Sequence, residues 1–302
     1  MKVLIKAEIV LIHFAIAFIG SYLSISVCEQ LRLSCGNFES SKKVVFERLG
    51  MLFLMTLSLG LIAIWSMHFI GMYSITLVQP GSGDKLEFRF DIVETVFSLL
   101  IALLFCYLGF YFSHLDVLFG LSKKEIMEIF IKQKREKLSI KEIKKIGNVQ
   151  ILVYMAFTKI HYIVLGGVCM GCGVVVMHYL GISNNNRYLL LILIILHTMY
   201  ILGMAAMKFQ GKILWNGGAI FASIFLAIVA SIVAFWILFR LLSLFPSFES
   251  LKLASAFAMA IAVCAVHNIG KFNCIISYCF HQCTCLKCYF DIKLYRNGSC
   301  II

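Results

Sequence analysis

Residues 65–72 read WSMHFIGM and end an apolar run that is long enough to cross a membrane. The rest of the chain is similar, because 61% of its 302 residues are apolar and only 14% are charged. A membrane-spanning helix needs roughly 20 mostly apolar residues. We therefore predict an all-α fold, a multi-pass transmembrane bundle of six to seven spans. The expected spans lie near residues 7–28, 49–72, 92–114, 160–182, 217–240 and 252–270, with 188–208 as a seventh candidate.

Basic residues predict how these spans are oriented. The formal net charge is +12, but in a multi-pass chain Lys and Arg concentrate in the inner loops, so this charge does not predict nucleic-acid binding. Nine basic residues lie between residues 121 and 148, in a loop that faces inward if the N-terminus is outside. Arg240 and Lys252 then fall on the same side. We expect a plasma-membrane protein with its N-terminus outside.

The segment 121–148 is the longest stretch that does not resemble a span. Its apolar residues Ile126, Ile129 and Phe130 have helical spacing, and basic residues outnumber acidic ones nine to four over residues 122–148. This pattern predicts a basic amphipathic helix in the cytosol, lying on the inner leaflet of the lipid bilayer. A solvated linker helix is the alternative interpretation.

A short pattern recurs at the ends of three expected spans: an apolar helix, a histidine and, three residues later, a glycine. The copies are His68 with Gly71, His178 with Gly181, and His267 with Gly270. Since the second, fourth and sixth spans run from inside to outside in the preferred topology, all three imidazoles should lie at one depth near the outer face. Titratable groups at membrane depth face the bundle interior and mark functional sites.

Methionines accompany these histidines. Met67 precedes His68, Met177 precedes His178, and Met72 is four residues after His68, on the same helical face. Imidazole and thioether together suit copper, with Cu(I) favoured by the soft sulfur. The expected metal ligands are His68, His178, His267, Met67, Met177 and Met72. The plainer interpretation is that each histidine is an interfacial or hydrogen-bonded packing residue.

The stretches WSMHFIGM (65–72) and VVVMHYLG (174–181) resemble the repeated motif of the MHYT domain, an integral membrane sensor module. The resemblance extends from about Ser21 to Gly270. It implies a membrane sensor with six or seven spans and with its motifs near the outer face. It also implies copper bound through Met and His and a diatomic ligand (oxygen, carbon monoxide or nitric oxide). A change in metal coordination would shift the packing of the spans, and we expect the helix within 121–148 to present that shift to an unknown cytosolic signalling partner. Carried over to this chain, the ligands are Met67, His68, Met177, His178 and His267.

The later motifs depart from the family pattern. The second copy lacks the threonine, since Leu180 follows Tyr179. The third copy has neither methionine nor tyrosine, since Val266 precedes His267 and Asn268 follows it. Membership of the third copy therefore depends on its histidine and on the glycine that follows.

Two segments disturb this organisation. A span at 188–208 would reverse every later helix, whereas removing residues 182–203 joins Gly181 to Met204 and restores a second HYLGM motif. We therefore interpret 182–203 as a translated intron or insertion, and residues 1–270 as the sensor domain. The Cys-rich tail, 271–302, is interpreted as non-native sequence read past a second splice site. A zinc site or a lipidation target in this tail is the alternative.

The predicted function is a membrane sensor for a diatomic gas or for redox state. A copper or small-solute transporter is the main alternative, although the polar residues gather at one end of the spans and not at the midplane. A proton-coupled channel is third. No nucleophile–base pair, phosphate loop or dinucleotide fingerprint is recognisable, so we predict no enzymatic activity.

Overall fold

A computed structural model describes twelve stretches of the chain. They are residues 2–36, 42–78, 85–86, 89–90, 92–116, 118–121, 123–135, 153–154, 156–179, 207–208, 217–245 and 248–282.

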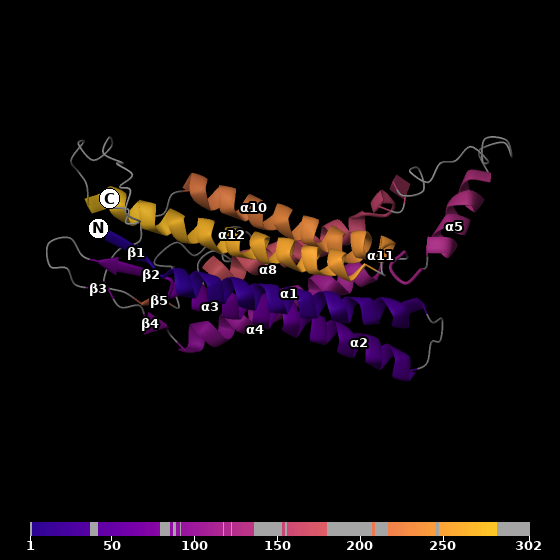
Figure 1. Cartoon of the computed structure of the whole chain (residues 1–302), viewed down its shortest axis with the longest axis horizontal. Coiled ribbons are helices and arrows are strands. Elements are labelled where there is room, and N and C mark those ends of the chain that lie inside the picture. The colour runs from indigo at the N-terminus through magenta and orange to yellow at the C-terminus, as the bar shows by residue number, and fades with distance from the viewer. Residues whose placement is uncertain are drawn as a thin grey trace, which may run out of the picture.

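Six helical rods form the body of the described structure (Figure 1). Five of them, counted over the described residues, are long and apolar enough to cross a membrane, and the fourth rod carries a shorter apolar stretch, His161–Val175. The multi-pass helical prediction is confirmed. The rods are α1 (Ala7–Gly36), α2–η1–α3 (Lys42–Thr56, Leu57–Ser66, Met67–Met72), α4 (Ile92–His114), α8 (His161–Tyr179), α10–η2–α11 (Gly217–Trp236, Ile237–Leu241, Leu242–Leu244) and α12 (Glu249–Gln282).

The rods pack side by side as a closed ring. Helix α1 contacts α12 on one side and the α2–η1 rod on the other, and the ring closes through α10, α8 and α4. Small residues let the backbones approach closely, as is usual between membrane helices. A Cβ atom on Gly167 of α8 would lie 2.6 Å from Cα of Ile232 in α10. The side chains inside the ring are therefore held by tightly packed helices.

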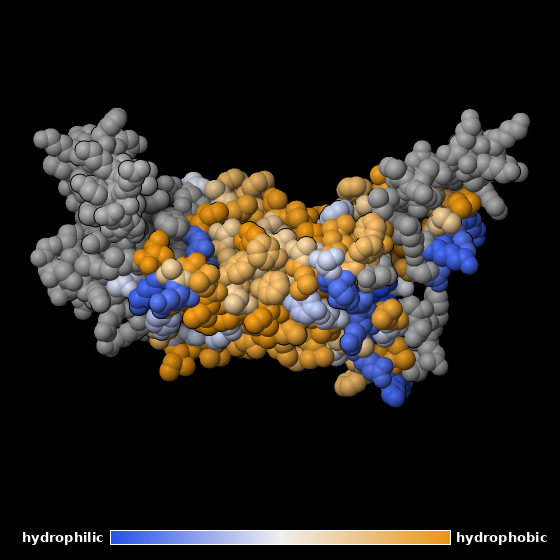
Figure 2. All heavy atoms as spheres, viewed as in Figure 1, coloured by the Kyte–Doolittle hydropathy of each residue, from blue (hydrophilic) through white to orange (hydrophobic). Residues whose placement is uncertain are grey.

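The surface agrees with a membrane location. Figure 2 shows an apolar band across the middle of the visible face, with hydrophilic residues gathered toward both ends. Large apolar side chains such as Phe46, Phe53, Phe221 and Phe257 are exposed along the rods. Exposing such an apolar surface to water would cost free energy, whereas contact with lipid chains does not.

Short strands cap the end of the bundle at which α1 begins and α3 ends. Strand β1 (Lys2–Ile5) pairs antiparallel with β2 (Ile75–Val78), with Ile5 opposite Ile75, and β3 (Lys85–Leu86) extends this sheet. A second antiparallel pair joins β4 (Arg89–Phe90) to β5 (Met207–Lys208). The expectation of a purely helical chain omitted these strands, which are two to four residues long and lie outside the spans.

The amphipathic helix that we predicted within 121–148 is present as α5 (Lys123–Arg135), and residues 136–148 lie outside the described part of the chain. Ile126 and Phe130 are buried and pack with Leu118 and Leu244, which follow α4 and end α11. Of the three apolar positions expected to face lipid, Ile129 alone is exposed. The helix therefore docks on the end of the bundle opposite the strands (Figure 1).

Candidate histidine site

His68 is fully buried near one end of the bundle, with 1% of its surface exposed. It lies in α3, directly after the π-helix η1, whose wider turns change the direction in which the next residues point. The Ser66 hydroxyl donates to the Leu61 carbonyl, five residues back, at 2.8 Å. The π-helix therefore contributes to aiming His68 at the bundle interior.

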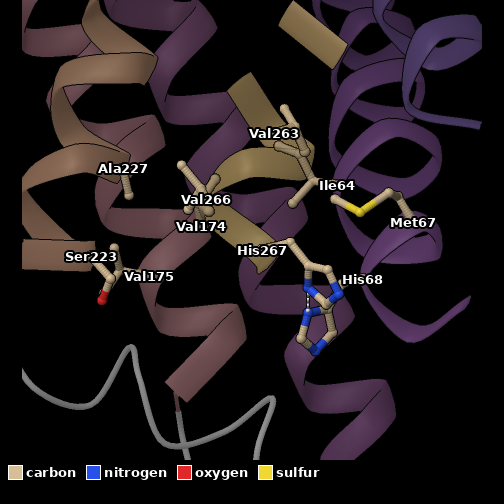
Figure 3. Close-up of a pocket in the computed structure, with 10 residues that line it drawn as sticks. All are labelled: Ile64, Met67, His68, Val174, Val175, Ser223, Ala227, Val263, Val266 and His267. Carbon is tan, nitrogen blue, oxygen red and sulfur yellow. Dashed lines mark hydrogen bonds between the residues drawn. The ribbon is translucent and has the colours of Figure 1, made fainter. Parts of the chain in front are cut away.

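His267 meets His68 inside the bundle, although the two are 199 residues apart in sequence. It lies in α12 and is 3% exposed. The Nδ1 atoms of the two imidazoles are 3.0 Å apart, and the rings are nearly perpendicular with centroids 4.9 Å apart (Figure 3). At this distance one Nδ1 donates a proton and the other accepts it, and two neutral rings in this contact would hold different tautomers.

Gly71 explains part of the His-x-x-Gly pattern. A Cβ atom at this position would lie 2.6 Å from Nε2 of His267, closer than two unbonded atoms can approach. The glycine of the first motif therefore makes room for the histidine of the third motif. This contact was not predicted, because the sequence pattern places each glycine beside its own histidine.

A third buried histidine joins the pair and was missing from the predicted site. His13 of α1 is 1% exposed, and its ring centroid lies 6.1 Å from that of His267. Its Nδ1 atom is 3.1 Å from the carbonyl oxygen of Ile9. The sequence carried a signal for it: a titratable residue near the start of the first span lies at the same end of the bundle as one near the end of the second.

The predicted methionine ligands of the first motif are both buried. Met67 is 1% exposed and packs with Ala17, Ala260 and Cys264. It also lines the cavity beside the imidazole pair, as the close-up shows (Figure 3). Met72 is buried in the last turn of α3.

The second motif reaches the same end of the bundle. Met177 and His178 form part of the last turn of α8, and their side chains lie outside the described part of the structure. Val174 and Val175 line the same cavity as His68 and His267. His178 follows Val175 by three residues, about 4.5 Å along the helix axis. The backbone of the second motif therefore lies at about the same depth in the bundle as His68 and His267.

A small cavity of about 20 Å³ lies beside the imidazole pair, lined by residues of η1, α3, α8, α10 and α12. Among the described residues that line it, Ser223 is the one other polar residue. A second cavity of about 40 Å³ has five of the same lining residues and continues into the bundle interior. Such volumes hold one or a few water-sized molecules. The shared residues are Ile64, Val174, Ala227, Val263 and Val266.

Imidazole and thioether groups, which are donor types that copper accepts, lie at this end of the bundle. Two imidazoles already meet there, and a thioether lies at the adjoining cavity wall, which is the mixed nitrogen and soft-sulfur set that copper prefers. Among the described residues, no group of three or more His, Cys, Asp or Glu side chains stands ready to hold a metal ion. Metal binding would therefore require the rings to turn from their direct contact.

Charged groups are buried at the other end of the bundle. Asp116, which follows α4, pairs with Arg240 of η2 at 2.6 Å, and Arg240 also donates to the Thr158 carbonyl at 2.6 Å. The Asp116 carboxylate accepts a further bond from the Leu118 N–H at 3.2 Å. Burial raises the pKa of the Asp116 carboxyl, and the Arg240 guanidinium opposes this shift. Arg240, expected as an inner-side charge, is therefore a buried structural partner.

Comparison with known proteins supports the resemblance to one family. The MHYT family, described as a bacterial signalling protein N-terminal repeat, matches residues 62–121 and 197–248. The first match contains Met67 and His68, whereas the second begins after His178 and ends before His267. No curated protein and no solved structure matches the chain.

Proposed function

We propose that this chain, which carries repeats of the MHYT family in a multi-pass membrane bundle, is a signalling sensor that binds copper at its histidine end. The histidine end is the end of the bundle that contains His13, His68 and His267. The observation that carries the proposal is the direct contact of two buried imidazoles from α3 and α12. A diatomic gas or a change in redox state is the proposed stimulus.

The site is suited to ligand exchange more than to holding helices together. Neutral imidazoles lose much of their hydration when they are buried, and a single hydrogen bond between them returns only about 1 kcal/mol. The cavity beside them leaves room for a small molecule. Bound copper would supply an open coordination position at which a diatomic ligand could bind.

His68 and His267 would hold the metal through their ring nitrogens. Gly71 positions the His267 ring by leaving space for its Nε2 edge. Met67 and Met72, together with Met177 and His178 of the second motif, are further proposed ligands at the same end.

Helix α10 offers a route from the histidine end to the cytosolic helix. Ser223 and Ala227 of α10 line the cavity beside the imidazole pair. The same rod continues through η2, where Arg240 binds Asp116, to Leu244, which packs against α5. A displacement of α10 by ligand binding would therefore reach α5. With the N-terminus outside, α5 would present this change to a cytosolic partner.

Metal analysis of the purified full chain tests the proposal. We expect about one copper per chain in wild-type protein reconstituted with Cu(I), and loss of that copper in His68→Ala and His267→Ala. His161→Ala is the matched control, because His161 is an exposed histidine at the start of α8, at the opposite end of the bundle. Copper absent from the wild type, or lost equally in the control, would contradict the proposal.

A copper transporter is a second candidate. The cavity beside the imidazole pair adjoins one lined by the thioethers of Met170 and Met259, deeper in the bundle. Thioethers in sequence along a membrane protein would suit the passage of Cu(I). Uptake of Cu(I) into proteoliposomes that contain the chain would favour this function over sensing.

A further inference from the structure

We propose that the cavity of about 40 Å³ deeper in the bundle, here called the apolar cavity, is a binding site for a small neutral apolar molecule. The inference deepens the proposed function by naming the chemical class of the stimulus, and it rests on that function for what the bound molecule does. Three features carry it: the chemistry of the cavity wall, the packing that leaves the space open, and the wall shared with the cavity beside the imidazole pair.

The wall of the apolar cavity offers almost no hydrogen-bonding side chains. Among the described residues that line it, Ser231 has the one hydroxyl group, and the others are Leu, Ile, Val, Ala, Met and Phe. A buried water molecule makes about two to four hydrogen bonds, so a cavity without such partners stays dry. An ion would lose far more hydration than such a wall could replace. The lining therefore favours a neutral apolar molecule over water or an ion.

The apolar cavity lies where α10 faces α12, and small side chains leave the space open. On its other side α10 is held close to α8, since a Cβ atom on Gly171 would lie 2.7 Å from Cα of Ile228. Helix α10 packs less extensively against α12 than against α8. Here the wall includes Ala230 and Ala234 of α10 and Ala262 of α12. A molecule in the space would gain the dispersion contacts that these short side chains leave unmade.

A molecule in the apolar cavity would lie next to the imidazole pair without using either ring. Ala227 and Val263 belong to the walls of both cavities. His68 and His267 line the smaller one. The apolar cavity would therefore hold a neutral ligand beside the proposed copper site and raise its local concentration there. A charged or strongly polar stimulus would gain nothing from this arrangement.

Xenon is the probe for the experiment, because it is neutral, apolar and chemically inert. The full chain, with labelled methionine methyl groups, is reconstituted in lipid nanodiscs without copper, and methyl NMR spectra are recorded at increasing xenon pressure. Met170 and Met259 line the apolar cavity, whereas Met55 is fully buried and lines neither cavity. We expect saturable shifts of the Met170 and Met259 signals and no saturable shift of the Met55 signal.

Filling the space should remove these shifts. Ala262→Leu extends a side chain from α12 into the apolar cavity, and Ala230→Leu does so from α10, so the saturable shifts should be lost in both variants. Ala258→Leu is the matched control, because it makes the same change at an exposed position one turn earlier on α12 and should bind xenon as the wild type does. Saturable shifts that persist in both filled variants would overturn the assignment of xenon to this cavity.

The outcomes separate this inference from the proposed function. Wild-type protein without saturable shifts at Met170 and Met259 would overturn the apolar cavity as a binding site, even if the chain binds copper. Wild-type protein that binds xenon in the cavity but takes up no Cu(I) when loaded would overturn the proposed function and leave the binding site standing. Xenon binding that is lost in the filled variants and kept in Ala258→Leu is the result that the inference predicts.

Discussion

The two ends of the bundle bury polar side chains in opposite ways. At the histidine end, imidazole meets imidazole across α3 and α12, with one hydrogen bond between the rings and a cavity beside them. At the α5 end, defined by Asp116, Arg240 and helix α5, a carboxylate and a guanidinium bind each other and are also bonded to backbone groups.

This difference indicates that the two ends of the bundle have different roles. Oppositely charged partners that are fully buried stabilise one arrangement and penalise the loss of either member. Neutral imidazoles can exchange their mutual hydrogen bond for another partner at small cost, since the net value of such a bond is low. The α5 end is therefore built to hold one structure, whereas the contact at the histidine end can be exchanged, as the proposed ligand binding requires.

Removal of Asp116 tests the structural end and should have the largest effect on stability. Asp116→Ala leaves the Arg240 guanidinium buried without its carboxylate, which should lower the free energy of unfolding by about 3–5 kcal/mol. Denaturant-induced unfolding in detergent measures this change. The double variant Asp116→Ala/Arg240→Met removes both charges and should recover much of the loss; a double variant less stable than the single one would contradict the account.

Removal of an imidazole should disturb stability less and ligand binding more. His68→Ala removes the hydrogen bond between the His68 and His267 rings, and we expect the free energy of unfolding to fall by about 1–3 kcal/mol. Copper binding should disappear in the same variant. Denaturant-induced unfolding and copper content, measured on one preparation, would check both expectations. A stability loss as large as that of Asp116→Ala would contradict the proposed difference between the two ends.

Gly71→Ala tests the contact between the first and third motifs. The added methyl group would displace the His267 ring, which we expect to lower stability by about 1–3 kcal/mol and to weaken Cu(I) binding. Gly50→Ala is the control, because nothing lies within 4 Å of a Cβ atom there. Competition with a Cu(I) chelator gives the Cu(I) affinity of both variants. Equal affinities for Gly71→Ala and Gly50→Ala would show that Cu(I) binding does not depend on the position of the His267 ring.

Release of α5 should have the smallest effect on the bundle. Phe130→Ala removes a buried ring from the contact with Leu118 and Leu244, so α5 should detach locally while the unfolding of the bundle changes little. Limited proteolysis should then cut within residues 123–135 faster than in wild type. Met127→Ala, which alters a more exposed position on α5, should leave the rate unchanged.

The sequence predicted the helices and part of the site. Apolar runs defined six spans because membrane helices must satisfy their backbone internally, whatever their partners. The meeting of His68 and His267 followed from placing both at one depth. His13 was missed because the search followed the His-x-x-Gly pattern, which α1 lacks.

Other features depend on tertiary contacts that local patterns do not encode. The π-helix η1 before His68 has an ordinary apolar sequence, so nothing in it distinguished a wider turn. The pairing of Asp116 with Arg240 joins residues on separate rods, and Arg240 alone resembled an inner-side charge. The segment 182–203 and the side chains of 271–302 lie outside the described residues, and their interpretation as non-native sequence stays a prediction.

Hydrogen exchange of the full chain with and without Cu(I) tests the central claim most directly. If the histidine end is the binding end, copper should slow exchange in peptides that cover Met67–Met72 and the α12 segment around His267, and should alter exchange in α5. Peptides around Asp116 and Arg240 should keep their slow exchange in both states. Unchanged exchange at the histidine end in the presence of copper would contradict the account.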